Sequence, residues 1–281
     1  MDQNEPILIT GCSTGIGRET ARHLASKGHR VYATARRLEA ISDLRDAGCE
    51  TLACDVNDEA SMAACVKAVE EAHGAVGSLV NNAGYSQSGA VETIPIDSVR
   101  RQFETNVFGL MRMCQLVLPK MRERGSGRIV NVSSMGGKLV FPGGGVYHAT
   151  KHAVEALSDA LRWEVQQFGI EVVIIEPGLI KTDFADTAVG SISETDTEGP
   201  YASFNHAVGK VTAGAYSGPA SKLGGGPETV ARKIEKALTT KRPRTRYTVT
   251  PSASIVMTQR KIFSDRMWDR FVKTQYPQPG P

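Results

Sequence analysis

The sequence lacks several features that would assign the protein to a specialised class. No run of about 18 apolar residues occurs in its 281 residues, so the sequence predicts no membrane-spanning helix. The first residues, MDQNEPILIT, contain no basic segment followed by a long apolar stretch, which argues against a secretory signal. The five cysteines form no C-x-x-C pair, which argues against a disulfide framework or a zinc site. We therefore expect a cytoplasmic protein with reduced thiols and no bound metal.

A strong excess of charge is also lacking, but the charge is unevenly placed. The formal net charge is only +3, so the composition gives no sign of a nucleic-acid partner. From Arg232 to the C-terminus, twelve Lys and Arg stand against three Asp and Glu. Residues 252–273 mix these basic residues with apolar ones at helical spacing, which predicts a basic amphipathic helix. We expect it to pack on its own domain or at a subunit interface; contact with an anionic membrane surface, or docking over an apolar pocket, is the alternative.

Short runs rich in Val and Ile alternate along the chain with segments of helical period. The predicted strands are 6–10, 30–35, 51–56, 78–83, 128–134, 171–177 and 246–250. The predicted helices are 18–28, 58–74, 96–124, 147–168 and 227–238. Strands that are apolar throughout are typical of a parallel sheet covered on both faces, and strand alternating with helix indicates an α/β fold. The sequence thus predicts one doubly wound, mostly parallel sheet of the Rossmann type.

The chain shows no linker that would divide it, so residues 1–281 are expected to form a single dinucleotide-binding and catalytic domain. One stretch differs from the rest. Residues 182–226 are rich in Gly, Ser, Thr and Ala and show weak periodicity. In a compact domain, so long a stretch is more often a lid or binding loop than a passive connection. We therefore expect a substrate lid there.

A glycine-rich turn, TGCSTGIG, follows the first predicted strand. It places Gly11, Gly15 and Gly17 before a helix. Glycine permits positive φ and lets the main chain approach a pyrophosphate, whose charge is favoured at a helix N-terminus. The spacing differs from G-x-G-x-x-G, so a turn that only connects two elements remains an alternative. Its position after the first strand favours dinucleotide binding.

The second predicted strand ends in YATARR, with Arg36 and Arg37 and no acidic residue before Glu39. An acidic residue here would bind the ribose hydroxyls of NAD, whereas a guanidinium can pair with the 2′-phosphate of NADP. The sequence therefore predicts NADP(H), with NAD(H) possible. Two solvated arginines at a helix entry fit this dipeptide equally well. Asp55, which ends the third strand, is a candidate acceptor for adenine or a simple turn residue.

Further motifs follow in order along the chain: NNAG at 81–84, Asn106, Ser134 in VNVSS, Tyr147-x-x-x-Lys151 and PG at 177–178. Together with TGCSTGIG, they make residues 5–185 resemble the short-chain dehydrogenase/reductase family. A narrower match, to the 17β-hydroxysteroid and retinol dehydrogenase group, is carried by GCSTGIG, YATAR, RGSGRIVNVSS and PRTRYTVT.

The resemblance implies a role for each of these residues. Tyr147 would donate a proton to a carbonyl and act as the base in alcohol oxidation. Lys151, on the same helical face, would lower the pKa of Tyr147 and bind the nicotinamide ribose. Ser134 would hydrogen-bond the substrate oxygen, and Asn106 would hold a water through which protons reach the lysine. With the turn and arginines above, the predicted cofactor site comprises Gly11, Ser13, Thr14, Gly15, Ile16, Gly17, Arg36, Arg37, Asp55, Val56, Asn82, Ala83, Gly84, Tyr147, Lys151, Pro177, Gly178 and Thr182.

Two neighbours of these residues are expected to be bystanders. Strand alternation should point Ser133 away from the side that Ser134 faces. His148 follows Tyr147 directly, and adjacent helical positions do not share a face. We therefore expect a structural or pocket-lining role for His148.

The sequence as a whole predicts an NADP(H)-dependent enzyme that interconverts a secondary alcohol and a carbonyl. Its narrower resemblance favours a lipophilic substrate, steroid- or retinoid-like, and the family resemblance implies a homodimer or homotetramer. A general reductase of small ketones and aldehydes is one alternative. A non-catalytic dinucleotide sensor of the same fold is another, against which the complete set of Asn106, Ser134, Tyr147 and Lys151 argues.

Overall fold

The computed structural model describes residues 4–194 and 199–279. Seven parallel strands form one sheet in the order β3-β2-β1-β4-β5-β6-β7. The strands are β1 (Ile7–Ile9), β2 (Val31–Ala35), β3 (Glu50–Ala53), β4 (Ser78–Asn81), β5 (Gly127–Val132), β6 (Ile170–Pro177) and β7 (Arg246–Val249). The predicted α/β fold with a doubly wound sheet is confirmed, and the sheet is parallel throughout.

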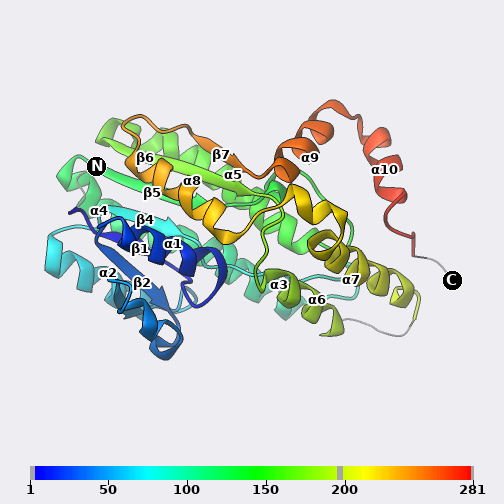
Figure 1. Ribbon diagram of the computed structural model, residues 1–281, viewed down its shortest axis with the longest axis horizontal. Coiled ribbons are helices and arrows are strands. Elements are labelled where there is room, and N and C mark those ends of the chain that lie inside the picture. The colour runs from blue at the N-terminus through cyan, green and yellow to red at the C-terminus, as the bar shows by residue number, and fades with distance from the viewer. Residues whose placement is uncertain (1–3, 195–198, 280–281) are drawn as a thin grey trace.

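Helices cover both faces of this sheet (Figure 1). One face carries α1 (Gly15–Ser26) and α8 (Pro227–Thr239). The other carries α2 (Glu59–His73), α4 (Gly109–Arg124) and α5 (Gly145–Val165). Short 3-10 turns complete the framework: η1 (Leu38–Leu44), η3 (Met135–Gly137) and η4 (Gln166–Phe168).

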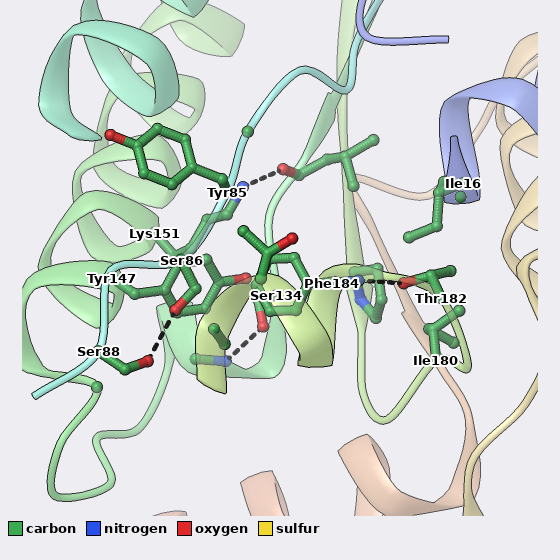
Figure 2. A pocket seen from close by; sticks show the side chains of 18 of the residues that line it. Ile16, Tyr85, Ser86, Ser88, Ser134, Tyr147, Lys151, Ile180, Thr182 and Phe184 are labelled. Carbon is green, nitrogen blue, oxygen red and sulfur yellow. Dashed lines mark hydrogen bonds between the residues drawn. The ribbon is translucent and has the colours of Figure 1, made fainter. Parts of the chain in front are cut away.

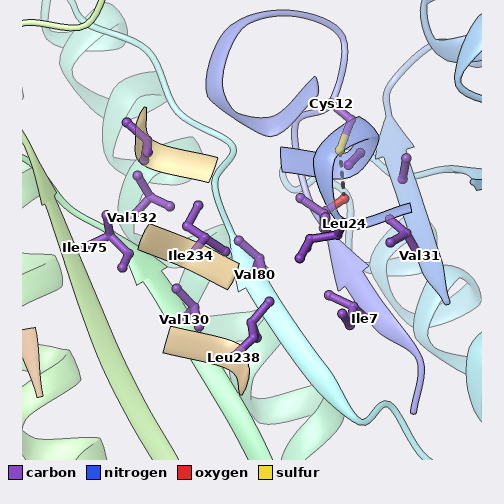
Figure 3. Close-up of a cluster of buried hydrophobic side chains, with 14 of the residues drawn as sticks. Ile7, Cys12, Leu24, Val31, Val80, Val130, Val132, Ile175, Ile234 and Leu238 are labelled. Atoms are coloured by element: carbon purple, nitrogen blue, oxygen red, sulfur yellow. Dashed lines mark hydrogen bonds between the residues drawn. The ribbon is translucent and has the colours of Figure 1, made fainter. Parts of the chain in front are cut away.

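The apolar strands follow from this layering, because each strand must supply both faces. In β1, Ile7 and Ile9 belong to the core under α1 and α8, whereas Leu8 belongs to the core on the opposite face. All three side chains are 0% exposed. Figure 3 shows the first of these cores, where Leu24 of α1 and Ile234 of α8 meet side chains of the sheet. Side chains that alternate between two buried faces make most strand positions apolar, and the buried polar ones that remain find partners, as Asn81 of β4 does with Asn131 of β5.

The predicted helix over 96–124 is one continuous element with an irregular centre. It comprises α3 (Ile96–Phe103), the π-helical turn η2 (Glu104–Phe108) and α4. Asn106 lies within η2. Single π turns inside α-helices are rare and frequent at functional sites, so this irregularity marks the place where Asn106 meets the rest of the site.

The predicted lid, 182–226, contains more helix than its composition indicated. It forms α6 (Phe184–Gly190), η5 (Ser191–Glu194), α7 (Ala202–Ser217) and η6 (Pro219–Leu223). This segment packs through its few larger apolar residues. Phe204 and Val208 of α7 join Ala90 and Ile192 in an apolar cluster separate from the two cores of the sheet. Figure 1 shows α6 and α7 beyond the ends to which the strands point.

The C-terminal segment differs from the single helix predicted over 252–273, because it forms two helices. They are α9 (Pro251–Ile262) and α10 (Asp265–Lys273). Phe263 is extended, with φ −74° and ψ 135°, and the Ser264 side chain accepts a hydrogen bond from the Met267 amide. A serine cap followed by an acidic first turn is a helix start signal, which explains the new helix at this point.

The two C-terminal helices pack on their own chain, in line with the preferred expectation. Trp268 of α10 is only 6% exposed, and its indole nitrogen donates to the Val140 carbonyl at 3.2 Å.

None of the helices in the described ranges is long and apolar enough to cross a membrane. All five cysteines are buried and free.

Candidate functional site

The glycine turn joins β1 to α1 in a conformation that needs glycine. Gly11 and Gly15 have φ values of +72° and +59°. A Cβ on Gly11 would lie 2.8 Å from the Ala83 Cα, and a Cβ on Gly17 would collide with Asn82. In the described chain, the Thr14 side chain makes no capping bond and the first turn of α1 holds no acidic residue. The first amides of α1 therefore point toward a place suited to an anion such as pyrophosphate.

Asn82, directly after β4, connects the end of this strand to the glycine turn by hydrogen bonds. Its side-chain amide donates to the carbonyl oxygens of Thr10 and Gly11, each at 3.0 Å. Its backbone N–H donates to the Thr10 hydroxyl, also at 3.0 Å. The segment NNAG thus fixes the main chain of the glycine turn rather than merely lying beside it.

The two arginines after β2 are placed differently. Arg36 lines the cavity that contains the glycine turn, but Arg37 does not. Asp55 lines the same cavity, and its carboxylate accepts from the Asn57 amide at 3.0 Å. Asp55 therefore forms a turn of its own and still faces the cavity, so both sequence interpretations of this residue fit.

One cavity of about 710 Å³ brings the predicted cofactor and catalytic residues together. All the predicted cofactor residues line it except Gly17 and Arg37, and Ser134, Tyr147 and Lys151 line it as well. Figure 2 shows Tyr147, Ser134 and Lys151 around one space, with Ile16 and Thr182 across from them. Dinucleotide and carbonyl chemistry would therefore share a single chamber.

Lys151 is a buried cation beside Tyr147. It is 6% exposed, and its ammonium donates to the Val132 carbonyl at 2.9 Å and lies 5.8 Å from the centre of the Tyr147 ring. Burial lowers the pKa of Lys151 to about 8, and the charge of Glu155 opposes this shift. Burial raises the pKa of Tyr147, and its hydrogen bond with Ser134 opposes that shift. The arrangement holds a protonated phenol next to a cation.

Asn106 does not line the cavity. It is 1% exposed, and its side-chain oxygen accepts from the Tyr85 amide at 3.1 Å. Its side-chain nitrogen donates to the Tyr85 carbonyl at 2.9 Å and to the Thr150 hydroxyl at 3.0 Å. The side chain therefore ties the segment after β4 to α5, and its polar atoms are taken up by these bonds.

The neighbours of the reactive residues have structural contacts. His148 Nδ1 lies 3.1 Å from the Gly136 carbonyl oxygen, and burial lowers the pKa of His148 to about 4. A neutral imidazole at Nδ1 donates this bond, so His148 supports the turn after Ser134 and lines the cavity. The Ser133 hydroxyl is buried against Gly137 and has no hydrogen-bond partner among the described residues.

The sequence motifs missed most of the cavity wall beyond Tyr147. The Phe184 ring lies 5.3 Å from that of Tyr147, and the Tyr276 ring stacks on Phe141 at 6.4 Å. Tyr276 follows α10, so the C-terminal segment supplies part of the wall. The other residues that line this end and that no motif indicated include Ser86, Ser88, Val208, Val211, Thr212 and Tyr216. No local signal marks them, because they come together only when residues 182–226 pack against the chain after β4.

Comparison with known proteins assigns the family. The model of the short chain dehydrogenase family matches residues 5–191. The chain belongs to this family. The short-chain dehydrogenase is 33% identical over 268 residues to the uncharacterized oxidoreductase YbbO of Escherichia coli K12, covering 95% of this chain and 93% of the relative. It is 34% identical over 275 residues to the NADPH-dependent 3-dehydrocapnine reductase of Ornithobacterium rhinotracheale, covering 94% of each chain.

Solved structures agree with the family assignment. A short-chain dehydrogenase from Streptomyces avermitilis superposes with a TM-score of 0.75 at 33% identity, covering 96% of each chain. A family member from Burkholderia phymatum in complex with NAD superposes with a TM-score of 0.78 at 25% identity, covering 99% of this chain and 97% of that one. The short-chain dehydrogenase is thus an oxidoreductase acting on alcohol or carbonyl groups. No metal-ligand group of three or more His, Cys, Asp or Glu occurs among its described residues.

The buried charge of Lys151 makes a testable contribution to stability. Its pKa in the folded chain, about 8, lies below its ordinary value of 10.5, so the unfolded chain binds more protons between these pH values. The folded state therefore gains stability as pH rises through that window. Lys151→Met should be more stable than wild type at pH 7, and the gap should shrink by about 2–3 kcal/mol by pH 10.

Urea denaturation of both proteins at the two pH values measures this gap. Lys67→Met, at an exposed position on α2, is the matched control and should give a gap that does not change. A constant gap for Lys151→Met would show that Lys151 is not a destabilising buried cation.

Proposed function

We propose that this chain reduces a lipophilic ketone or aldehyde with NADPH and oxidises the corresponding secondary alcohol in reverse. The observation that supports the proposal best is the shared cavity, in which Tyr147, Ser134 and Lys151 face the glycine turn. A binding protein without turnover has no need for a buried ammonium beside a phenol, because burying a charge is costly.

In this proposal, the cofactor supplies the hydride when it is bound. Tyr147 donates a proton to the substrate oxygen, and Ser134 aligns that oxygen by a hydrogen bond. The positive charge of Lys151, 5.8 Å from the phenol ring centre, favours the phenolate that remains. In the oxidation of an alcohol, the same phenolate accepts the proton. Residues of η2 and α5 are held in register by Asn106.

The preference for NADP(H) is supported by Arg36. It is exposed at the edge of the cavity, where β2 ends, and a guanidinium there can pair with the 2′-phosphate. The relative from Ornithobacterium rhinotracheale is NADPH-dependent by name, whereas the structure from Burkholderia phymatum holds NAD. Arg37 lies outside the cavity, so we assign it no contact with the cofactor.

The preference for a lipophilic substrate is supported by the walls beyond Tyr147. Phe141, Phe184, Val208 and Val211 supply apolar surface there. Steroid- or retinoid-like compounds remain within this class. Burial raises the pKa of Tyr276, which closes this end of the cavity, to about 12. A chamber of such walls gains binding free energy from apolar area rather than from ion pairs.

We include in the proposal a homodimer or homotetramer formed through the long helices. Trp163 on α5 is 82% exposed, and Phe108 and Met111, at the start of α4, are 47% and 37% exposed. These exposed apolar side chains on α5 and at the start of α4 are the surface that the proposed second subunit would cover.

Tyr147→Phe removes the proposed proton donor while leaving the ring in place. We expect turnover of ketones to fall by about 10²–10⁴-fold, with NADPH affinity unchanged. The measurements are NADPH consumption with ketones of increasing chain length, and NADPH binding by fluorescence. Tyr201→Phe, which removes a phenol at the start of α7, is the control. Turnover that survives in Tyr147→Phe would refute the mechanism, and NADPH binding without turnover in wild type would favour a sensor.

Arg36→Ala tests the cofactor preference. Loss of a charge-assisted hydrogen bond of about 1.5–3 kcal/mol should lower the ratio of kcat/KM for NADPH to that for NADH by about 10–100-fold. Arg37→Ala is the matched control, since it removes the same charge one residue outside the cavity. Equal effects of the two variants, or an unchanged ratio in Arg36→Ala, would exclude recognition of the 2′-phosphate by Arg36.

Tyr276→Ala tests the substrate wall. Loss of an aromatic contact of about 1.5–3 kcal/mol should raise KM for a long-chain ketone by roughly 10–100-fold and leave a three-carbon ketone nearly unaffected. Tyr276→Phe keeps the ring and should behave like wild type. An equal rise of KM for both substrates would argue that the C-terminal segment acts on the cofactor end instead.

A further inference from the structure

A cluster of charges is built around the buried carboxylates of Glu155 and Glu176, and Glu155 stands one turn along α5 from Lys151. Glu155 follows Lys151 by one turn of α5 and is only 3% exposed. One of its oxygens accepts from the Lys138 ammonium at 2.8 Å and from Arg246 Nε at 3.0 Å. Its other oxygen has no hydrogen-bond partner among the described residues. Glu155 is therefore a buried anion that two cations hold in place.

Arg246 extends the cluster to two more carboxylates. Its guanidinium lies 2.5 Å from an Asp159 oxygen and 3.4 Å from a Glu176 oxygen. Glu176 is 2% exposed and also accepts from the Thr248 hydroxyl at 2.9 Å. Arg162 pairs with the other oxygen of Asp159 at 2.5 Å. The cluster thus holds three carboxylates, on Glu155, Asp159 and Glu176, and three cations, on Lys138, Arg162 and Arg246.

The cluster joins the elements that carry the site. Lys138 lies just after η3, the turn that follows Ser134. Glu176 stands next to Pro177 at the end of β6, and Arg246 begins β7. The contact with η3 is close, since a Cβ on Gly137 would lie 2.8 Å from the Glu155 Cγ and 3.0 Å from the Lys151 carbonyl oxygen. The charges therefore connect the proton-transfer helix to the chain around Ser134 and the end of β6.

The energetics argue against stability as the reason for this cluster. Charges that leave water lose solvation that their mutual attraction only partly restores, and buried ion clusters can often be replaced by apolar side chains at no cost. Two carboxylates at 2–3% exposure also repel each other, and the charge of Glu155 helps to raise the pKa of Glu176. An electrostatic effect on a neighbouring charged group explains the cluster better than a contribution to stability.

Lys151 is that neighbour. Its ammonium donates to the Val132 carbonyl of β5 and lies over the Tyr147 ring. Glu155 follows Lys151 by one turn on the same face of α5, and its side chain and the Lys151 carbonyl both border Gly137 of η3. The charge of Glu155 raises the pKa of Lys151 against the effect of burial. Lys138 and Arg246 in turn face Glu155 and weaken its field.

We propose that Glu155 is a positioning residue that keeps Lys151 charged beside Tyr147, and that Lys138 tunes the strength of this support. The part that concerns Lys151 stands on the cluster itself, and the part that concerns Tyr147 rests on the proposed function. Glu155→Gln keeps the shape of the side chain and removes the charge. Lys138→Gln removes a cation from a partly exposed position, with 34% of its side chain exposed.

The two variants should shift the titration of Lys151 in opposite directions. We expect Glu155→Gln to lower the pKa of Lys151 by about one unit and Lys138→Gln to raise it, because an opposite charge favours an ammonium and a like charge disfavours it. The measurement is the NMR titration of the lysine side-chain carbons in the full chain, with Lys151 assigned by its loss in Lys151→Met. Glu164→Gln, at an exposed site on α5, should leave the titration unchanged.

The activity readout moves in the opposite direction to the Lys151 titration, because a less charged Lys151 favours the Tyr147 phenolate less. The rising limb of kcat/KM against pH for alcohol oxidation should move to higher pH in Glu155→Gln, with partial return in Glu155→Asp. An unchanged Lys151 titration in Glu155→Gln, or a downward shift in Lys138→Gln, overturns the proposal. If the Lys151 titration shifts but the rising limb of kcat/KM does not, the proposed effect of Lys151 on Tyr147 is overturned. Absence of turnover in wild type refutes the proposed function alone, since the titration still decides the support of Lys151. If Glu155→Gln does not fold, the direction in Lys138→Gln decides.

Discussion

The burial of the Lys151 ammonium is the constraint on which the site depends. A cation at 6% exposure persists only where the surrounding protein compensates its lost hydration. Here a backbone carbonyl of β5 accepts its hydrogen bond, and a carboxylate of the same helix stands one turn away. Both the hydrogen bond and the nearby carboxylate require that α5 lies against the end of β5. The packing of this one helix on the sheet therefore decides whether a charged group is available next to the Tyr147 phenol.

The parallel sheet explains why so many distant segments meet at this place. Every strand runs the same way, so the carboxyl ends of β1, β2, β4, β5 and β6 share one edge. The glycine turn, Arg36, Asn82 and Ser134 each come just after one of these strands, and Pro177 ends β6. Ligands of open α/β sheets bind at this edge. Motifs that lie far apart in the sequence therefore meet at one cavity, because all strands run in the same direction.

Much of this was predictable from the sequence, for identifiable reasons. Strands buried on two faces leave apolar runs, and the glycines at 11 and 15 mark backbone that other residues rarely adopt. The helices within 182–226 were hidden, because α7 is built from small residues whose helical period is weak. The break at Phe263 has a local signal in the Ser264 cap, but the positions of Trp268 and Tyr276 depend on contacts with Val140 and Phe141, far away in sequence. Arg37 and Arg36 look alike in sequence, and only the path of the chain after β2 separates them.

Because Tyr276 lies in the cavity wall, the lining of the cavity comes from two separate parts of the chain. Ser134, Tyr147 and Lys151 lie after β5 and on α5, whereas the far wall comes from α7 and from the last residues of the described chain. Side chains in the far wall pack mainly on one another and on the loop at Phe141. Substitutions there can reshape what the chamber accepts while the distances between Lys151, Tyr147 and Ser134 stay as they are. Substrate range can therefore diverge between descendants of this chain without any loss of chemical competence.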